Sequence, residues 1–301
     1  MKLKYNLRGE EEATGKNREM AEHGAFQFLR YFFPSIVPLL IYLGVTIGLV
    51  VISSTLIYPF LSHEEYLRQK LNIYNSLGVF VTFFILKRYS KKRSSTFFGD
   101  ASLNLKDLSL QKALLSVVFG VGAAIAISSL ISLLPKIGPI ATYQNSIEGL
   151  YRSWSVLLGV LVNTFFTPIV EEVIFRGYML NRLLPHWGEK WALLTVSLVF
   201  AFMHGTSIWI LYAFIMGFII GKLAIKENNI FYAIVMHVGF NLPASVLWHI
   251  YVFFPGSEEA LRQNKWMIAL LGLLGLVSLI FAYKVYNRRN DSREVSGETL
   301  S

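Results

Sequence analysis

The sequence predicts an all-α, polytopic membrane protein with about eight transmembrane helices. Of its 301 residues 54% are hydrophobic, and the mean hydropathy is +0.48. Only 16% are charged, whereas a soluble protein carries about 25%. The apolar residues come in long blocks rather than at amphipathic spacing, and a block of roughly 20 residues is long enough to cross a bilayer. The absence of cysteine excludes disulfides, thiolate zinc sites and cysteine nucleophiles.

The apolar blocks predict eight spans along the chain. The fourth is long and carries acidic residues, and the sixth contains Gly217-x-x-x-Gly221, a pattern that lets helices approach closely. Pro135 ends the third span, and Pro168 interrupts the fourth because it removes a backbone donor. The expected spans are 36–58, 73–86, 110–134, 154–184, 191–204, 208–225, 230–254 and 266–285.

The distribution of basic residues predicts that both termini are cytoplasmic. If the chain crosses the membrane eight times, successive loops alternate between the two sides. Lysine and arginine are more frequent in the segments on the side of the N-terminus than in the loops on the other side. The net charge of +9 then reflects orientation and contact with anionic lipid rather than binding of nucleic acid.

The chain is expected to form one transmembrane domain between two tails. Residues 1–34 form a cytoplasmic tail with an interfacial helix, residues 35–286 the transmembrane domain, and residues 287–301 a polar C-terminal tail. No apolar segment typical of a cleaved signal peptide begins in the first thirty residues. These features predict a multi-pass protein of the cell membrane, of the kind found in a bacterial plasma membrane.

The fourth span carries three charged residues within six positions: Glu171, Glu172 and Arg176. On insertion scales each costs about 2.5–3.5 kcal/mol at the centre of a bilayer, so their presence indicates a function. Arg176 follows Glu172 by four residues, and on a helix the two side chains can pair. Such a pair can also simply neutralise itself and lock two helices together.

Two other spans supply polar groups that suit hydrolysis. The fifth ends in Phe200-Ala-Phe-Met-His204, and the seventh contains His237-Val-Gly-Phe-Asn241, in which the His and the Asn share a helix face. A carboxylate in low dielectric is a good general base, a neutral His can share the water or protonate a leaving amine, and a His and an Asn can stabilise an oxyanion. A lone His or Asn in a span is often only a packing contact. The joint occurrence of all these groups favours a site.

The same residues leave metal binding open. Glu171, His204 and His237 are acceptable ligands for a divalent metal such as zinc, although no His-Glu-x-x-His motif is present. The residues alone therefore do not decide whether a cofactor is needed.

Together these motifs resemble the CAAX prenyl protease type 2 family, also called the CAAX protease and bacteriocin-processing family (CPBP, or ABI). The residues that carry the resemblance are Glu-Glu-x-x-x-Arg at 171–176, Phe-x-x-x-His at 200–204 and His-x-x-x-Asn at 237–241. They lie in order on separate spans, within a family-like core of about residues 110–254. The first 150 residues contribute no motif.

The resemblance implies an intramembrane endopeptidase that uses glutamate-activated water or a metal and acts on a peptide or a membrane-protein tail. Glu171 would activate water, His204 would assist, and His237 with Asn241 would stabilise the oxyanion. Glu172, Arg176 and Phe200 would support the site, which is expected to be reached from the cytoplasm through Arg176 and the next loop. CAAX-type cleavage, bacteriocin processing and self-immunity are the implied roles.

Two other classes of function compete with the peptidase. A non-catalytic scaffold or immunity protein would use the polar cluster for helix packing or partner binding. A transporter would use buried ionisable groups as an ion path, but the chain shows no inverted repeat, and these groups cluster in one half. The oligomeric state is not predicted.

Overall fold

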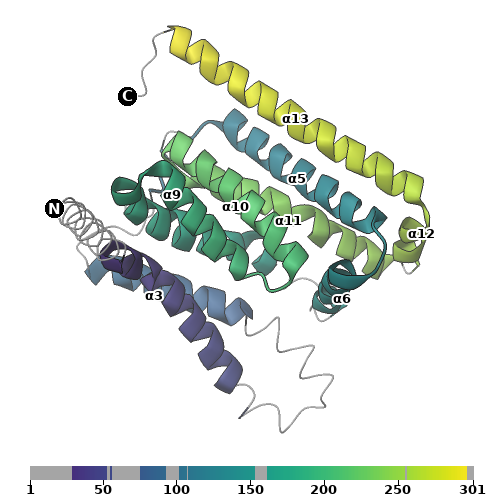
Figure 1. The fold of residues 1–301 in the computed structure, drawn as a ribbon, viewed down its shortest axis with the longest axis horizontal. Coiled ribbons are helices and arrows are strands. Elements are labelled where there is room, and N and C mark those ends of the chain that lie inside the picture. The colour runs from purple at the N-terminus through teal and green to yellow at the C-terminus, as the bar shows by residue number, and fades with distance from the viewer. Residues whose placement is uncertain are drawn as a thin grey trace, which may run out of the picture.

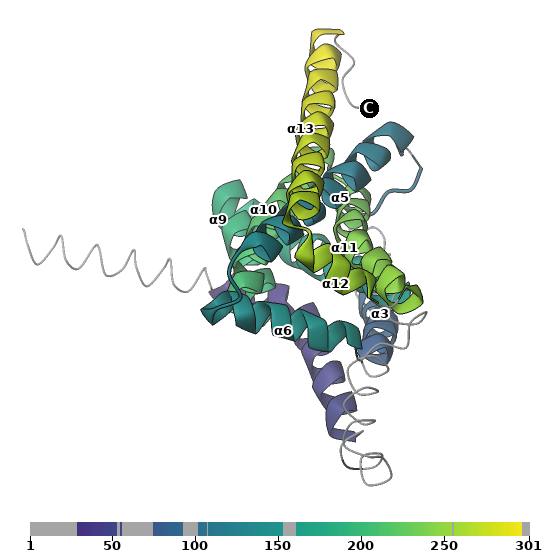
Figure 2. The same cartoon turned by 90° about the vertical axis from the view of Figure 1, so that its right-hand side faces the viewer.

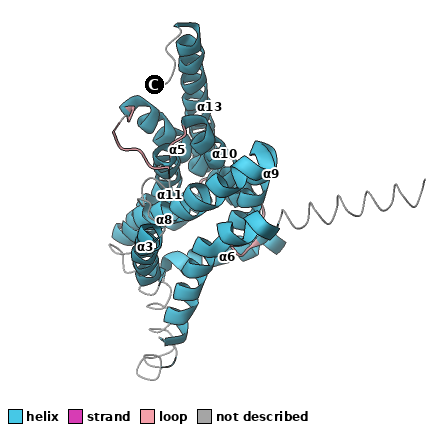
Figure 3. Ribbon diagram, turned by 90° about the vertical axis from the view of Figure 1, so that its left-hand side faces the viewer, coloured by secondary structure: helices cyan, strands magenta, loops and turns pink. Residues whose placement is uncertain are grey.

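The computed structural model describes residues 29–52, 55, 75–92, 102–106, 108–152, 161–254 and 256–296. Within these ranges the chain forms only helices, turns and loops, as Figure 3 shows. The predicted all-α class is confirmed. Residues 1–28, 53–54, 56–74, 93–101, 107, 153–160, 255 and 297–301 lie outside the described residues, and with them most of the predicted N-terminal tail and parts of the first, second and fourth predicted spans.

Five described helices are long and apolar enough to cross a membrane: Leu29–Ile52, Leu110–Leu133, Ser207–Glu227, Ile230–Leu247 and Lys265–Asn287. They coincide with the first, third, sixth, seventh and eighth predicted spans, so the chain is a polytopic membrane protein. The described parts of the other three predicted spans are helical, except that residues 203–204 at the end of the fifth form a turn. By length and composition these three are not among the candidates. The total of eight and the orientation stay predictions.

Both predicted tails are partly helical. Residues 29–34 belong to the same continuous helix as the first span. At the other end, α13 runs over Lys265–Ser296, so most of the predicted polar tail 287–301 continues the last span. The reason is local, since this stretch contains no proline or glycine before Gly297 to stop a helix.

Helix α5 (Leu110–Leu133) lies between α11 (Ile230–Phe253) and α13, as Figure 1 shows. Its glycines allow this close packing on two faces. A Cβ on Gly120 would collide with the carbonyl oxygen of Met236 in α11, and one on Gly122 would lie 2.7 Å from that of Gly275 in α13. Ser109 caps the start of α5, and the helix ends just before Pro135, as predicted.

The remaining helices complete the bundle. They are α3 (Asn75–Lys92), α6 (Gly138–Arg152), α9 (Asn181–Phe202), α10 (Ser207–Glu227) and α12 (Ser257–Gln263). Helix α9 packs along α10, and its path turns at Gly188, where φ is 70°. Figure 2 shows α6 lying across the direction of α13. The buried core is formed mainly by residues 170–240, and much of α13 exposes leucine, valine and phenylalanine, as expected of a face against lipid.

Candidate active site

The acidic residues lie in a segment whose helical pitch changes twice. A π-helical turn, η3 (Val162–Phe166), is followed by the short helix α8 (Thr167–Glu172) and a second π-helical stretch, η4 (Val173–Leu180). Pro168, which lacks a backbone N–H, is in the first turn of α8. Wide π turns are rare and recur at functional sites. Here they place Glu171 and Glu172 at the junction between α8 and η4.

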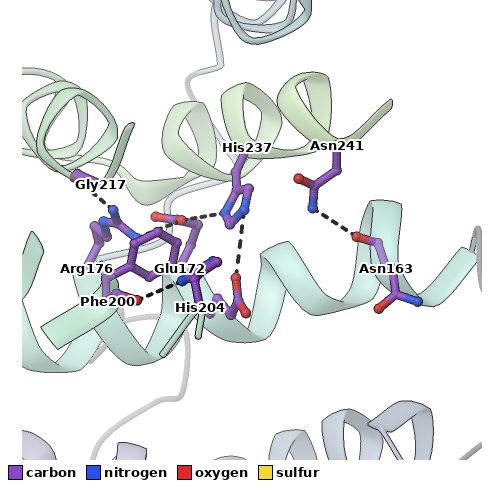
Figure 4. Close-up of polar contacts among 9 residues, drawn as sticks. Asn163, Glu172, Arg176, Phe200, His204, Gly217, His237 and Asn241 are labelled. Atoms are coloured by element: carbon purple, nitrogen blue, oxygen red, sulfur yellow. Dashed lines mark hydrogen bonds and ion pairs between the residues drawn. The ribbon is translucent and has the colours of Figure 1, made fainter. Parts of the chain in front are cut away.

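Glu172 is the centre of a buried ion-pair network, drawn in Figure 4. Its side chain is 0% exposed, and its Oε1 accepts hydrogen bonds of 2.8 Å from Nη1 of Arg176 and 2.8 Å from Nδ1 of His237. Arg176 also donates from Nη2 to the carbonyl oxygen of Gly217 at 2.8 Å. The predicted pairing of Glu172 with Arg176 is thus confirmed. The link from Glu172 to His237 joins α8 to α11.

Phe200 and Gly217 enclose the Arg176 guanidinium. The guanidinium carbon lies 4.8 Å from the centre of the Phe200 ring, within the range of a cation–π contact. A Cβ on Gly217 would lie 3.1 Å from Cδ1 of Phe200 and 3.5 Å from Nη2 of Arg176. The close approach predicted from the Gly217-x-x-x-Gly221 pattern is confirmed, because a Cβ on Gly221 would lie 2.6 Å from Leu193 of α9.

Glu171 lies beside the same histidine but in a different environment. Its side chain is 18% exposed, and its Oε2 lies 3.7 Å from Nε2 of His237. The His237 ring therefore stands between two carboxylates, with one nitrogen directed to each. A carboxylate accepts hydrogen bonds, so His237 donates its Nδ1–H to Glu172. Its Nε2 is left facing Glu171.

His204 follows the end of α9, where backbone carbonyls have lost their helical partners. Its Nδ1 lies 2.8 Å from the carbonyl oxygen of Phe200. Since a carbonyl only accepts, His204 donates its Nδ1–H, and Nε2 is free to act as an acceptor. The Phe200 ring centre lies 4.6 Å from that of His204 and 5.9 Å from that of His237, so the two histidines flank one aromatic ring.

Asn241 extends the polar groups along α11. Its Nδ2 donates to the carbonyl oxygen of Asn163 in η3 at 3.0 Å. This bond orients the amide and leaves its second N–H available. One turn further along α11, Ser245 and Thr164 hydrogen-bond each other through their hydroxyls, and both are buried. Figure 4 shows the Asn163–Asn241 pair on one side of His237, with Arg176 and Gly217 on the other.

Some of these contacts were not predicted. The carbonyl oxygen of Gly217 and the bond from Glu172 to His237 depend on how helices pack, and no local pattern shows them. Ser245 could have been found, since it continues the four-residue spacing of His237 and Asn241 on one face of α11.

One known family matches the part of the sequence that contains these residues. Residues 153–243 match the sequence model of a family described as type II CAAX prenyl endopeptidase Rce1-like. This stretch is an Rce1-like domain. It spans every proposed site residue from Asn163 to Asn241, and it leaves out α5 and α13. No curated protein and no solved structure matches the chain.

The described part of the chain contains no preformed metal site. No three His, Asp or Glu side chains there are placed so that they could hold a metal ion. Nδ1 of His204 and Nδ1 of His237 each bond an oxygen, which leaves Nε2 of both rings open. Metal-binding histidines are commonly oriented by such a bond, so a metal held by Glu171, His204 and His237 stays a prediction.

The expected route into the Rce1-like domain is wrong. Access was predicted through Arg176 and the loop that follows it. Arg176 is 1% exposed, and every residue from Val173 to Leu180 is buried. The physical reason is that α9 and α10 pack against this stretch and cover it. Within residues 161–180 the exposed and partly exposed positions all lie between Leu161 and Glu171.

Proposed function

We propose that the protein is an intramembrane endopeptidase in which Glu171 activates the attacking water. The observation that carries this proposal is the contrast between adjacent carboxylates. Glu172 is buried and pairs through Oε1 with Arg176 and His237, whereas Glu171 is partly exposed and faces the free nitrogen of His237 at 3.7 Å. That gap is wider than a hydrogen bond and leaves Glu171 free to bind a water. The Rce1-like match independently implies a peptidase.

The remaining residues then have separate tasks. His204 has a free Nε2 that can take a proton and pass it to the leaving amine. His237 and the second N–H of Asn241 supply donors for the oxyanion of a tetrahedral intermediate once His237 carries a proton on Nε2. Glu172 and Arg176 hold the His237 ring in place and are positioning residues.

A second observation favours a site that admits polar ligands. Oε2 of Glu172 is buried and has no hydrogen-bond partner among the described residues. A buried acceptor without a donor costs about 1–3 kcal/mol, so it favours a site where water or a substrate N–H comes close. The proposed substrate is a peptide or the tail of a membrane protein. In this proposal the chain crosses a cell membrane eight times, with both termini cytoplasmic.

The experiment that tests this function compares cells that express the wild-type chain with cells that express Glu171→Gln or His204→Ala. New peptide termini in the membrane and secreted fractions are identified by mass spectrometry, and a prenylated CAAX peptide serves as a defined probe. We expect termini that appear with the wild type and are lost in both variants, with equal amounts of folded protein. Full cleavage by both variants would refute the proposal.

The alternative is a non-catalytic scaffold or immunity protein, which the buried Glu172–Arg176–Gly217 network favours because it joins three elements. Under this alternative Glu171→Gln keeps full function as long as the protein folds. Under the peptidase proposal Glu171→Gln abolishes the cleavage activity, because an amide cannot take a proton from water.

A further inference from the structure

Two helices that precede the matched stretch pack against each other in opposite directions. They are the helix Leu29–Ile52, called here the N-terminal helix, and α3. A Cβ on Gly78 of α3 would lie 3.2 Å from the hydroxyl oxygen of Thr46. Arg182 donates to the carbonyl oxygen of Pro34, and its guanidinium carbon lies 5.9 Å from the centre of the Tyr89 ring. Pro34 comes before Thr46, whereas Tyr89 comes after Gly78, so the two helices are antiparallel.

This antiparallel packing places Tyr42 at the level of Thr82. Tyr42 lies one turn before Thr46, and Thr82 lies one turn after Gly78, so each shares a helix face with a residue at the contact. Thr82 is 0% exposed, and Tyr42 is partly buried. The two side chains are therefore on the facing sides of these helices.

Helix α3 also packs along the segment 161–180, which carries the acidic residues. Figure 3 shows α3 beside α8, and residues of the two helices are in contact. The ring centres of Phe80 and Phe166 are 4.8 Å apart, and those of Tyr89 and Tyr178 are 6.3 Å apart. Both contacts follow the same order along the chain, so α3 and this segment run in the same direction.

Thr82 is at the level of Glu171 in this packing. It lies two residues past Phe80, and the corresponding turn of α8 runs from Thr167 to Glu171. The charge of Glu171 acts on the phenol of Tyr42, which agrees with this arrangement. Three helices therefore bring a hydroxyl group to the neighbourhood of Glu171.

Buried hydroxyl groups in this region lack protein partners. The Oγ1 atoms of Thr46, Thr82 and Thr167 are buried, and none has a hydrogen-bond partner among the described residues. A threonine in a helix can bond the carbonyl oxygen one turn earlier, as Thr55 and Thr142 do. A buried hydroxyl without a partner lowers stability, so a group of them favours a bound water.

We infer that Tyr42 and Thr82 hold the water that Glu171 activates, so that the N-terminal helix and α3 form a wall of the site. Both helices lie outside the matched residues 153–243. The role in cleavage rests on the proposed function, whereas the bound water rests on packing and on the unpaired hydroxyl groups alone.

The chemistry of the hydroxyl groups suits this task. A hydroxyl both donates and accepts, so a water bonded to Tyr42 and Thr82 still has a proton to give to Glu171. That proton passes to Glu171, and the water oxygen forms the new bond to the carbonyl carbon of the substrate. Tyr42 and Thr82 keep their own protons and act as positioning residues.

The burial of Thr82 fits water rather than a peptide group. Its side chain is enclosed between helices, where a single water fits more readily than a peptide chain. Packing alone does not explain a threonine here, because valine offers a similar shape without a hydroxyl group that needs a partner.

Variants that remove one hydroxyl group test the role in cleavage. Tyr42→Phe and Thr82→Val keep the shape of each side chain. We expect each to lower kcat about three- to tenfold, the size of one hydrogen bond, with KM unchanged. Thr82→Ser keeps a hydroxyl and should retain most of the wild-type kcat, and Tyr283→Phe, at an exposed position of α13, is the control. An unchanged kcat in both hydroxyl-removing variants, or a change in KM alone, would overturn this role.

Unfolding temperatures test the bound water without any substrate. If one water joins Tyr42 and Thr82, each single substitution loses a bond, and the double variant loses less than the sum because both losses concern the same water. We expect this pattern for Tyr42→Phe, Thr82→Val and the double variant. A hydroxyl that binds no water is better replaced by valine. Thr82→Val unfolding at or above the wild-type temperature, or strictly additive losses, would therefore contradict the water site.

The two tests can fail separately. If the wild type cleaves no peptide, the proposed function is lost, and the unfolding temperatures still decide whether the water site exists. If the wild type cleaves but Tyr42→Phe and Thr82→Val are as fast, the peptidase stands and the role of these two residues is refuted.

Discussion

Residues 161–171 and residues 172–180 form one continuous helical segment, yet the two halves have opposite properties. The first half is partly exposed, begins with a π turn and ends at Glu171. The second half is wholly buried and contains the Glu172–Arg176 pair. Adjacent carboxylates on a helix point in different directions, so one can stay open to substrate while the other holds the packing together. The comparison teaches that a charged motif need not have a single role.

The largest effect on stability is expected from Glu172→Ala. Removing one member of a buried pair leaves the Arg176 charge without compensation and costs about 3–5 kcal/mol. We expect a large drop in the unfolding temperature of the purified protein, measured by tryptophan fluorescence. We also expect loss of activity. Glu189→Ala, at an exposed position, is the control and should change the free energy of unfolding by less than about 0.5 kcal/mol. Equal effects of the two substitutions would contradict the buried role of Glu172.

An intermediate effect is expected from Gly217→Ala. The added methyl group would lie 3.1 Å from the Phe200 ring and close to the Arg176 guanidinium, and overpacking of this kind costs about 1–3 kcal/mol. Gly44→Ala is the matched control, because a Cβ there meets nothing within 4 Å and alanine favours helix. We expect thermal unfolding to show destabilisation for Gly217→Ala and none for Gly44→Ala. A neutral result for both would mean that α9 and α10 do not pack as closely as described.

The smallest effect is expected from Thr164→Val, which removes the hydroxyl bonded to Ser245. Hydrogen bonds between helices in membranes contribute about 0.6 kcal/mol on average, so stability should barely change. The rate of cleavage should fall clearly although stability barely changes. The reason is that the same turn carries the Asn163 carbonyl that orients Asn241. Thr164→Ser keeps the hydroxyl and should restore the rate. If valine and serine behave alike, the hydroxyl has no part in positioning Asn241.

The sequence predicts the parts of this molecule that depend on short-range spacing. Apolar blocks locate the five long spans, the four-residue interval predicts the Glu172–Arg176 pair, and the Gly217-x-x-x-Gly221 pattern predicts a close helix contact. Each follows from helical geometry within one segment. The ordered motifs also point to the family whose model matches residues 153–243.

What could not be predicted depends on how distant segments pack. Nothing in the spacing shows that His237 bonds Glu172 more closely than it approaches Glu171, or that the carbonyl oxygen of Gly217 accepts from Arg176. The route of access was predicted wrongly for the same reason. Charge order along the chain suggested the loop after Arg176, but burial of residues 173–180 is set by α9 and α10, which come later in the sequence.

The most direct test of the account is the cleavage rate of Glu171→Gln in a protein that still folds. A substrate found by the comparison of termini is mixed with wild type or variant in lipid vesicles, and product is followed over time. Loss of a general base lowers rates by about 10²–10⁴-fold, and we expect a fall of this size with an unchanged unfolding temperature. A folded Glu171→Gln protein that cleaves at the wild-type rate would contradict the assignment of Glu171 as the base.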